Sequence, residues 1–282
     1  MQRLAFIPAL ALLTCLAAAP ARADVTIKST VKATGPMAME GQSVSSIKGT
    51  KMRIETTMSG DMAAMMPNAQ PGKPLKTVAI VDVDRRQMTV LDESTKTATV
   101  YDLGKIASQM QQAGGPSDVK VSMSPTGQSR QILGRQCVEY KLSVTMVVTP
   151  PMGGSSMTIT LGGPTWIAKD APGSGDFAAF YKAAGENGLF FTPNAAAAAN
   201  NVQTRGMAAM YKALAETGGI PYEQVIQVNM EAADSQRADM MKRAGQPATT
   251  MTVTGVSTDP IPDEMFTVPP GYTTRNATAP GR

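Results

Sequence analysis

The chain has 282 residues, a net charge of +4 and no histidine. Without histidine, serine–histidine and cysteine–histidine catalysis, histidine general bases and nearly every catalytic zinc site are excluded. Basic and acidic residues are interspersed without a long basic stripe, which argues against nucleic-acid binding. Composition therefore favours a protein that is not an enzyme and needs no cofactor.

The first residues have the order of a secretory signal. Arg3 gives a positive start, an apolar run covers 4–13, and Ala21-Arg22-Ala23 supplies small residues before Asp24. The run is too short for a membrane-spanning helix, which needs about 20 residues. We expect cleavage after Ala23 and a soluble bacterial protein that is periplasmic or secreted.

Two cysteines raise separate questions. Cys15 allows a lipoprotein signal, but such signals have a small Gly, Ala or Ser before the lipidated cysteine, and Thr14 stands there. Cleavage after Ala23 leaves Cys137 as the sole thiol, so the domain would depend on its core rather than on disulfides. Cys137 lies in a strand-like pattern and is predicted to be a buried, inert residue.

Strands dominate the predicted structure. Apolar and polar residues alternate at every second position, most clearly from Val138 to Met146, as expected for antiparallel strands with one solvated face. The predicted strands are 24–34, 41–49, 51–58, 76–84, 86–93, 95–101, 118–124, 127–133, 138–146, 156–161, 164–169, 222–232 and 248–258. Short turns after 82 and 92 make three of these strands a meander.

Helices are few. Asp102 can cap a helix over 103–112, Ser174 or Asp176 can start one that ends near Ala184, and 203–217 has helical spacing. Gly60–Lys73 and Thr149–Ser156 are predicted to be loops. Composition never shifts sharply, which predicts a single domain over 24–272 and a flexible tail over 273–282.

Three short motifs resemble those of a known group. Ile132–Tyr140 is similar to an "I-x-G-x-x-C-x-x-Y" strand entry, Thr165–Asp170 to "W-[IV]-[AT]-K-D", and Met265–Tyr272 to a closing "F-x-[VI]-P-x-G-Y". Gly219-Ile220-Pro221 before a strand also fits. The chain thus resembles an uncharacterised, domain-of-unknown-function family of exported bacterial proteins related to the LolA/LolB-like lipoprotein carriers. The resemblance implies a curved, incompletely closed antiparallel barrel with helices on its open side and an apolar cavity.

The leading functional hypothesis is a lipid or other apolar ligand in that cavity, because curled, half-solvated sheets can enclose a ligand. Methionine suits such a surface because it is flexible and polarisable. The expected lining residues are Val25, Ile27, Val31, Met52, Ile54, Met58, Val138, Tyr140, Leu142, Val144, Met146 and Trp166. The competing interpretation is that these side chains simply fill a core, with Trp166 and Tyr140 as packing residues.

Soft-metal binding is a second hypothesis. Met62, Met65 and Met66 lie close together in a predicted loop, and thioethers favour Cu(I). Met37 and Met39 would be weaker partners. Core packing explains the methionines elsewhere in the chain.

Two further alternatives remain. The protein could have a structural role in the cell envelope and contact another envelope protein or a membrane transiently, for example by strand addition. An enzyme would have to use acids such as Asp82, Asp84, Asp92 and Glu93, or Ser155 and Ser174. The acids lie at predicted turns and the serines have no neighbouring base, so non-catalytic function is favoured.

Overall fold

The computed structural model describes residues 24–35, 38–60, 73–112, 119–148, 156–189, 191, 202–232 and 248–277. The strands are β1 (Val25–Thr34), β2 (Met39–Lys48), β3 (Lys51–Gly60), β4 (Leu75–Asp82), β5 (Gln87–Asp92), β6 (Thr97–Asp102), β7 (Val119–Ile132), β8 (Arg135–Val148), β9 (Met157–Ala168), β10 (Ile220–Ala232), β11 (Ala248–Ser257) and β12 (Thr273–Asn276). The helices are α2 (Leu103–Gln112), α3 (Ser174–Glu186), α5 (Val202–Glu216) and the 3₁₀ helix η1 (Asp263–Phe266).

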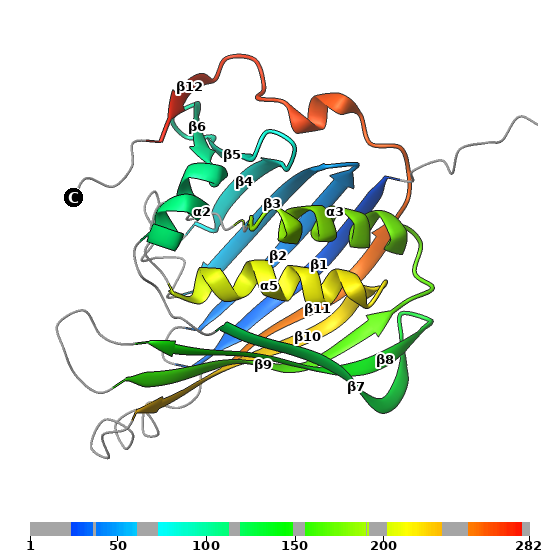
Figure 1. Cartoon of the computed structure of the whole chain (residues 1–282). Coiled ribbons are helices and arrows are strands. Elements are labelled where there is room, and N and C mark those ends of the chain that lie inside the picture. Colours follow the sequence, from blue (N-terminus) through cyan, green and yellow to red (C-terminus); the bar gives the residue numbers. More distant parts are fainter. Residues whose placement is uncertain are drawn as a thin grey trace, which may run out of the picture.

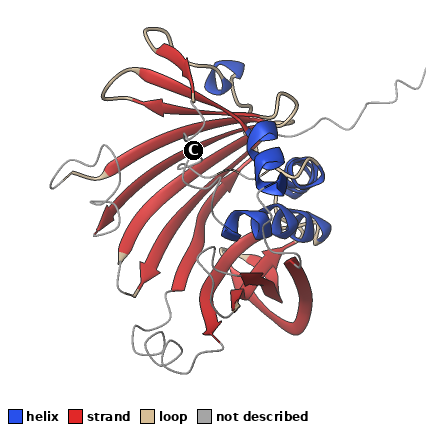
Figure 2. Cartoon of the chain, turned by 60° about the vertical axis from the view of Figure 1, so that its left-hand side comes forward, coloured by secondary structure: helices blue, strands red, loops and turns tan. Residues whose placement is uncertain are grey.

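All these strands form one sheet in the order β12-β6-β5-β4-β3-β2-β1-β11-β10-β9-β8-β7. Neighbours are antiparallel except β12 and β6, which are parallel. The strands β12 and β7 lie at opposite ends of the order, so the described sheet is not closed. The sheet curves around α3 and α5, which lie together on its concave side (Figure 1; Figure 2). The predicted fold class is therefore confirmed.

The first and the last long strands meet in the middle of the sheet. β1 pairs with β2 on one side and with β11 on the other, where Thr26 stands opposite Ser257 and Thr34 opposite Ala248. Because β11 also pairs with β10, this antiparallel pairing joins β1 to β6 with β7 to β11 within the sheet.

Helices α3 and α5 pack side by side against one end of the concave face. Gly185 of α3 lies where an added Cβ would be 3.1 Å from the backbone nitrogen of Lys212 in α5, so the helices can approach closely. Phe177 and Phe180 of α3 are buried, and Tyr211 of α5 stacks on Phe191 with ring centroids 4.9 Å apart. Such aromatic pairs contribute about 0.5–1.5 kcal/mol beyond the area they bury.

Two predicted helix starts are confirmed. The Oδ1 atom of Asp102 accepts a hydrogen bond from the backbone N–H of Lys105 at 2.8 Å, which caps α2. Helix α3 begins at Ser174. The residue before it is Gly173, with φ 75°, and the Ser174 hydroxyl donates instead to the carbonyl of Lys169 at 3.1 Å.

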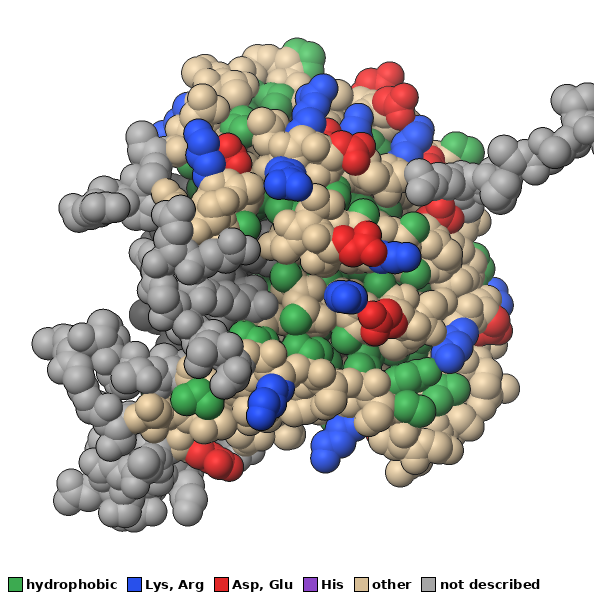
Figure 3. Space-filling model, viewed as in Figure 1, with side chains coloured by type: hydrophobic (Ala, Val, Ile, Leu, Met, Phe, Trp, Pro, Cys, Tyr) green, Lys and Arg blue, Asp and Glu red, His purple; other side chains and the backbone are tan. Residues whose placement is uncertain are grey.

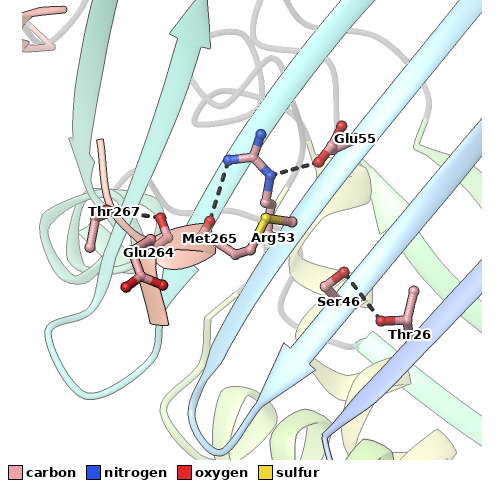
Figure 4. A network of polar contacts seen from close by, with 7 residues as sticks. All are labelled: Thr26, Ser46, Arg53, Glu55, Glu264, Met265 and Thr267. Atoms are coloured by element: carbon pink, nitrogen blue, oxygen red, sulfur yellow. Dashed lines mark hydrogen bonds and ion pairs between the residues drawn. The ribbon is translucent and has the colours of Figure 1, made fainter. Parts of the chain in front are cut away.

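The C-terminal segment 258–272, which we call the strap, covers the convex side of β3 to β6. Ile261 and Phe266 pack in a separate small core whose sheet members are Val78, Ile80, Leu91 and Ala98. The Lys48 ammonium donates to the Ile261 carbonyl at 2.8 Å and pairs with Asp263 at 2.8 Å. Arg53 donates to the Met265 carbonyl at 3.3 Å and pairs with Glu55 at 2.7 Å (Figure 4).

Strand divisions were predicted incorrectly at two places. The predicted strands 118–124 and 127–133 are a single strand, β7, with an irregularity between Pro125 and Ser129. Likewise, 156–161 and 164–169 are both parts of β9, which continues through Gly162 and Gly163. Glycine and proline commonly mark turns, but in a sheet they also mark bulges and close approaches.

The tail prediction needs correction too. Residues 273–276 form β12, whose Thr273 N–H donates to the Lys96 carbonyl and which is followed by Ala277 donating to Val100, both at 2.8 Å. Residues 278–282 lie outside the described residues.

Other predictions also fall outside the described residues. These are the signal at 1–23, most of the loops over 60–73 and 149–156, Met37, and the metal-site candidates Met62, Met65 and Met66. Within the ranges given above, no helix combines the length and apolar composition needed to cross a bilayer.

Candidate ligand-binding site

Side chains that point inward from the sheet fall into two regions. Near α3 and α5 they are fully packed, as with Val25 and Met52, which join a core with Phe180 and Leu214. Farther along the strands, the inward side chains are only half-buried by the described residues. We call this second region the trough, and its members include Val31, Ser43, Ser45, Ile54, Thr56, Thr77, Leu161, Ile226, Val228 and Met251.

The predicted lining residues divide between these regions. Val25 and Met52 are core residues, and Leu142, Val144 and Met146 are buried together in a cluster that also contains Met210 of α5. Gly206 of α5 lies so close to this cluster that an added Cβ would be 2.7 Å from a Val144 methyl group. Val31, Ile54 and Val138 stay half-buried, whereas Ile27, Met58 and Tyr140 are buried but retain slight exposure.

Trp166 was predicted to line the same face, and this was wrong. In the register, Tyr140 stands opposite Thr165 and Glu139 opposite Trp166, so Trp166 points to the convex side. There the Arg130 guanidinium lies 4.1 Å from the Trp166 ring centroid and pairs with Glu223 at 2.6 Å. Trp166 is thus a packing residue covered by a cation, and only 9% of it is exposed.

Charge is separated between the two faces of the central strands, whereas Arg275 of β12 lies on the inward side at the sheet edge, where its Nε donates to the Thr99 hydroxyl at 3.0 Å. The inward positions of β1 to β4 and of β8 to β11 carry no charged side chain in the part of the chain that the structure describes. The charged residues of these strands occupy outward positions, for example Lys32 and Glu40, which pair at 3.0 Å. Space filling shows hydrophobic side chains between α5 and β7 on the concave side (Figure 3).

One described cation lies near an inward residue at the end of a strand. Lys169 follows β9, and its ammonium lies 5.7 Å from the Tyr140 ring centroid. It is exposed to solvent, so it does not place a buried charge inside the concave face.

Polar residues on the inward face were missed by the sequence analysis. Ser29, Ser43, Thr56 and Thr77 stand opposite one another on β1 to β4. On the other side of β11, Gln224 donates to the hydroxyl of Thr165 at 3.4 Å. Ser29 and Thr56 share the alternation phase of Val25 and Met52, so the sequence contained the signal, but only apolar members of each phase were considered.

A separate hollow lies at the far ends of β1 to β4. It has a volume of about 540 Å³, and most side chains lining it, including Thr30, Gln42, Thr57 and Ser59, occupy outward positions. Val31, Gly41 and Met58, from inward positions, also line this hollow. Its lining includes the ion pair of Lys32 and Glu40, which distinguishes it from the predicted apolar site.

Acids considered for catalysis have local structural partners. Asp82 accepts a hydrogen bond from the Arg85 N–H at 3.0 Å, and Asp92 accepts one from the Ser94 N–H at 2.9 Å, as turn residues do. Asp84 accepts from the Thr50 hydroxyl at 2.7 Å. In the described ranges, no cluster of three or more His, Cys, Asp or Glu residues could hold a metal ion.

Buried titratable groups are held in their neutral forms. Burial raises the pKa of the Cys137 thiol, and Asp170 nearby adds to the effect. Burial alone raises the pKa of Tyr181 to about 12, and the pKa of Tyr211 is also raised. These shifts result from packing, and the three groups lie in or against the main core rather than in the trough.

Comparisons with known proteins give three results. The crystal structure of the LolA superfamily protein NE2245 from Nitrosomonas europaea aligns with 88% of this chain and 91% of its own, at 8% identity and a TM-score of 0.28. It belongs to the superfamily that the sequence motifs predicted, but a TM-score this low carries no argument about shared geometry or ligands. No curated protein matches the chain. The model of the family described as a domain of unknown function, DUF4412, matches residues 29–194, and the chain belongs to that family.

Proposed function

We propose that the protein is an exported binding protein that holds a lipid or another apolar ligand in the trough. The observation that carries this proposal is the absence of charged side chains from the described inward positions of β1 to β4 and of β8 to β11. Half-exposed positions readily accept lysine or glutamate. If the part of the concave face beyond the helices only contacted water, some of its positions would therefore be expected to carry charged side chains. Here the exclusion continues past the packed core into half-buried positions such as Val31 and Met251.

Apolar ligand binding fits the physical character of the trough. Covering apolar surface stabilises a complex by about 25 cal/mol for each Å² removed from water. Met58 and Met251 add flexible side chains that can adapt to acyl chains of different shape. The uncovered part of the concave face could therefore bind a ligand without first unfolding the core formed with α3 and α5.

Two observations support export as part of the proposal. Residues 1–23 have the composition of a cleavable signal. Asp24, the residue after the predicted cleavage site, is held in the fold: its Oδ2 atom accepts a hydrogen bond from the Ile261 N–H at 2.6 Å and lies 3.8 Å from the Lys48 ammonium. Cleavage after Ala23 would thus leave the whole described domain intact.

A charge introduced into the trough tests the proposal. Val31→Lys places an ammonium at an inward, half-buried position, whereas Thr30→Lys places one at the adjacent outward position. With delipidated protein and the fluorescent apolar probe N-phenyl-1-naphthylamine, we expect saturable binding at micromolar concentrations. Val31→Lys should weaken it at least tenfold, because an unpaired charge resists burial, and Thr30→Lys should leave it unchanged.

Circular dichroism and urea unfolding of both variants check that the fold is retained. Absence of saturable probe binding by the wild-type protein would reject the proposed function. Equal effects of the two lysines would place the probe elsewhere than in the trough.

A further inference from the structure

Four inward hydroxyl groups form a continuous row across neighbouring strands. The register places Ser29 of β1 opposite Ser43 of β2, Ser43 opposite Thr56 of β3, and Thr56 opposite Thr77 of β4. Adjacent strands are about 4.8 Å apart, so the row extends over roughly 14 Å. We call these residues the hydroxyl row.

The hydroxyl row lacks hydrogen-bond partners within the described structure. None of its four side chains donates to or accepts from another described residue. Ser29 is only 7% exposed, yet its oxygen is not sealed from solvent, because no fully enclosed side-chain oxygen is left unpaired among the described residues. A nearly buried hydroxyl with an open side and no partner can bond to a ligand or to water.

The rows on both sides of the hydroxyl row are mainly apolar. On the side near the helices the neighbouring positions are Ile27, Ser45, Ile54 and Ala79, and on the other side they are Val31, Gly41, Met58 and Leu75. A ligand that crosses these rows would therefore need apolar parts with a hydrogen-bonding group between or beside them.

The chemistry of the row selects among such groups. A hydroxyl both donates and accepts, so it suits an ester carbonyl or an alcohol equally well. No described cation is on the trough to pair with a carboxylate or phosphate, and burying an ionised group without a partner is costly. Resting on the proposed function, we infer that the ligand of the trough is an acyl compound with an uncharged, oxygen-rich head, such as a glyceryl ester, and that the hydroxyl row binds this head.

Three probes with different heads test the inference. 1-Oleoylglycerol and oleate share one acyl chain, and N-phenyl-1-naphthylamine reports on apolar binding alone. At pH 8, we expect 1-oleoylglycerol to bind at least tenfold more tightly than oleate. Oleate affinity should fall about tenfold for each pH unit above the solution pKa of the acid, because only the neutral form enters, whereas 1-oleoylglycerol affinity should not change with pH.

Matched variants assign the effect to the row. The triple variant Ser29→Ala, Ser43→Ala and Thr56→Val removes three hydroxyls with little change of volume and should weaken 1-oleoylglycerol about tenfold or more. It should not change binding of N-phenyl-1-naphthylamine. The control is Ser46→Ala with Thr57→Val, which removes two outward hydroxyls from the same strands and should change neither.

The outcomes separate the two proposals. If N-phenyl-1-naphthylamine does not bind, the proposed function fails. If it binds but oleate at pH 8 binds as tightly as 1-oleoylglycerol, or if the triple variant binds 1-oleoylglycerol normally, the inference about the head group is wrong while the proposed function stands. Loss of oleate binding in Lys169→Met would likewise contradict the inference about the head group, because that result would show that the Lys169 ammonium binds the oleate carboxylate.

Discussion

Gly162 of β9 lies so close to the backbone of β8 that no larger residue fits without moving one of the two strands. A Cβ at this position would lie well inside 3.0 Å of the carbonyl oxygen of Leu142 in β8, and backbone atoms cannot move away as a flexible side chain can. The neighbouring Gly163 faces the carbonyl of Val225 in β10 in the same manner. The glycine pair therefore permits β9 to continue between β8 and β10 where larger residues would force them apart.

Alanine substitution tests this requirement. Gly162→Ala should lower the free energy of unfolding by about 1–3 kcal/mol, the usual cost of overpacking, as measured by urea unfolding. Gly255→Ala in β11 is the control, because its added Cβ meets nothing within 4 Å. A Gly162→Ala protein as stable as wild type would mean that β8 and β9 separate readily here.

Cys137 provides a second prediction for a single residue. Its side chain is fully buried and burial raises its pKa, so the reactive thiolate is disfavoured in the folded protein. Labelling by a disulfide reagent at pH 8 should be at least a hundredfold slower in native protein than in urea-unfolded protein. Comparable rates would show that the strand around Cys137 opens easily.

At the scale of elements, polar contacts attach the first half of the strap to the sheet. Lys48 joins Ile261 and Asp263 of the strap to Asp24 at the start of β1, and Arg53 holds the Met265 carbonyl. A hydrogen bond from Lys48 holds the pKa of the Asp263 carboxyl below its ordinary value, and the same bond raises the pKa of Lys48.

The pH dependence of this pair follows from the two shifts. Asp263 has a lowered folded pKa, so its stabilisation is present above the ordinary value of 3.8 and is lost as pH falls through the folded pKa. Lys48 has a raised pKa, so its contribution is complete below 10.5 and is lost as pH rises through the folded pKa. Asp263→Asn should therefore cost stability between these limits and nothing beyond them, as followed by urea unfolding from pH 2.5 to 11.5.

Glu93→Gln is the control for that experiment, because Glu93 is an exposed turn acid with no ion pair among the described residues. A stability difference for Asp263→Asn of the same size at every pH from 2.5 to 11.5 would indicate a packing defect rather than a lost ion pair.

Elements also show what sequence alone could predict. β8 was predicted well because its two faces meet different surroundings, so alternation from Val138 to Met146 appears directly in the residues. β12 was missed because it pairs through its backbone in parallel with β6, and all four of its side chains are exposed. Thr273–Asn276 has no alternation of apolar and polar residues that would indicate an edge strand.

The candidate site was predictable only in part. Alternation within one strand identifies which residues share a face, and it correctly grouped Val31 with Ile27. The face of Trp166 depends instead on how β9 aligns with β8, which is decided by tertiary structure. The hydroxyl row could not be predicted for the same reason, because Ser29 and Thr77 are brought into one row only by the register of four strands.

For the whole molecule, we expect the pairing of β1 with β11, which connects the two parts of the sheet, to be required for folding. A chain that ends at Gln246 lacks β11, the strap and β12, so β1 and β10 each lose a partner. We expect no cooperative unfolding transition for it in urea, followed by Trp166 fluorescence. A chain that ends at Ala277 is the control and should unfold as the full chain does; a cooperative transition in the shorter chain would show that either half folds alone.

The pairing of β1 with β11 also affects when folding can occur. Thr30 and Thr252 stand opposite each other although 222 residues separate them. Contacts so distant in sequence slow folding, because a very large loop must close before they form. If the chain is threaded through a membrane channel from its amino end, its leading strand emerges long before its partner. In that case the pairing of β1 with β11 could not form until nearly all of the chain had arrived, which would delay completion of the sheet.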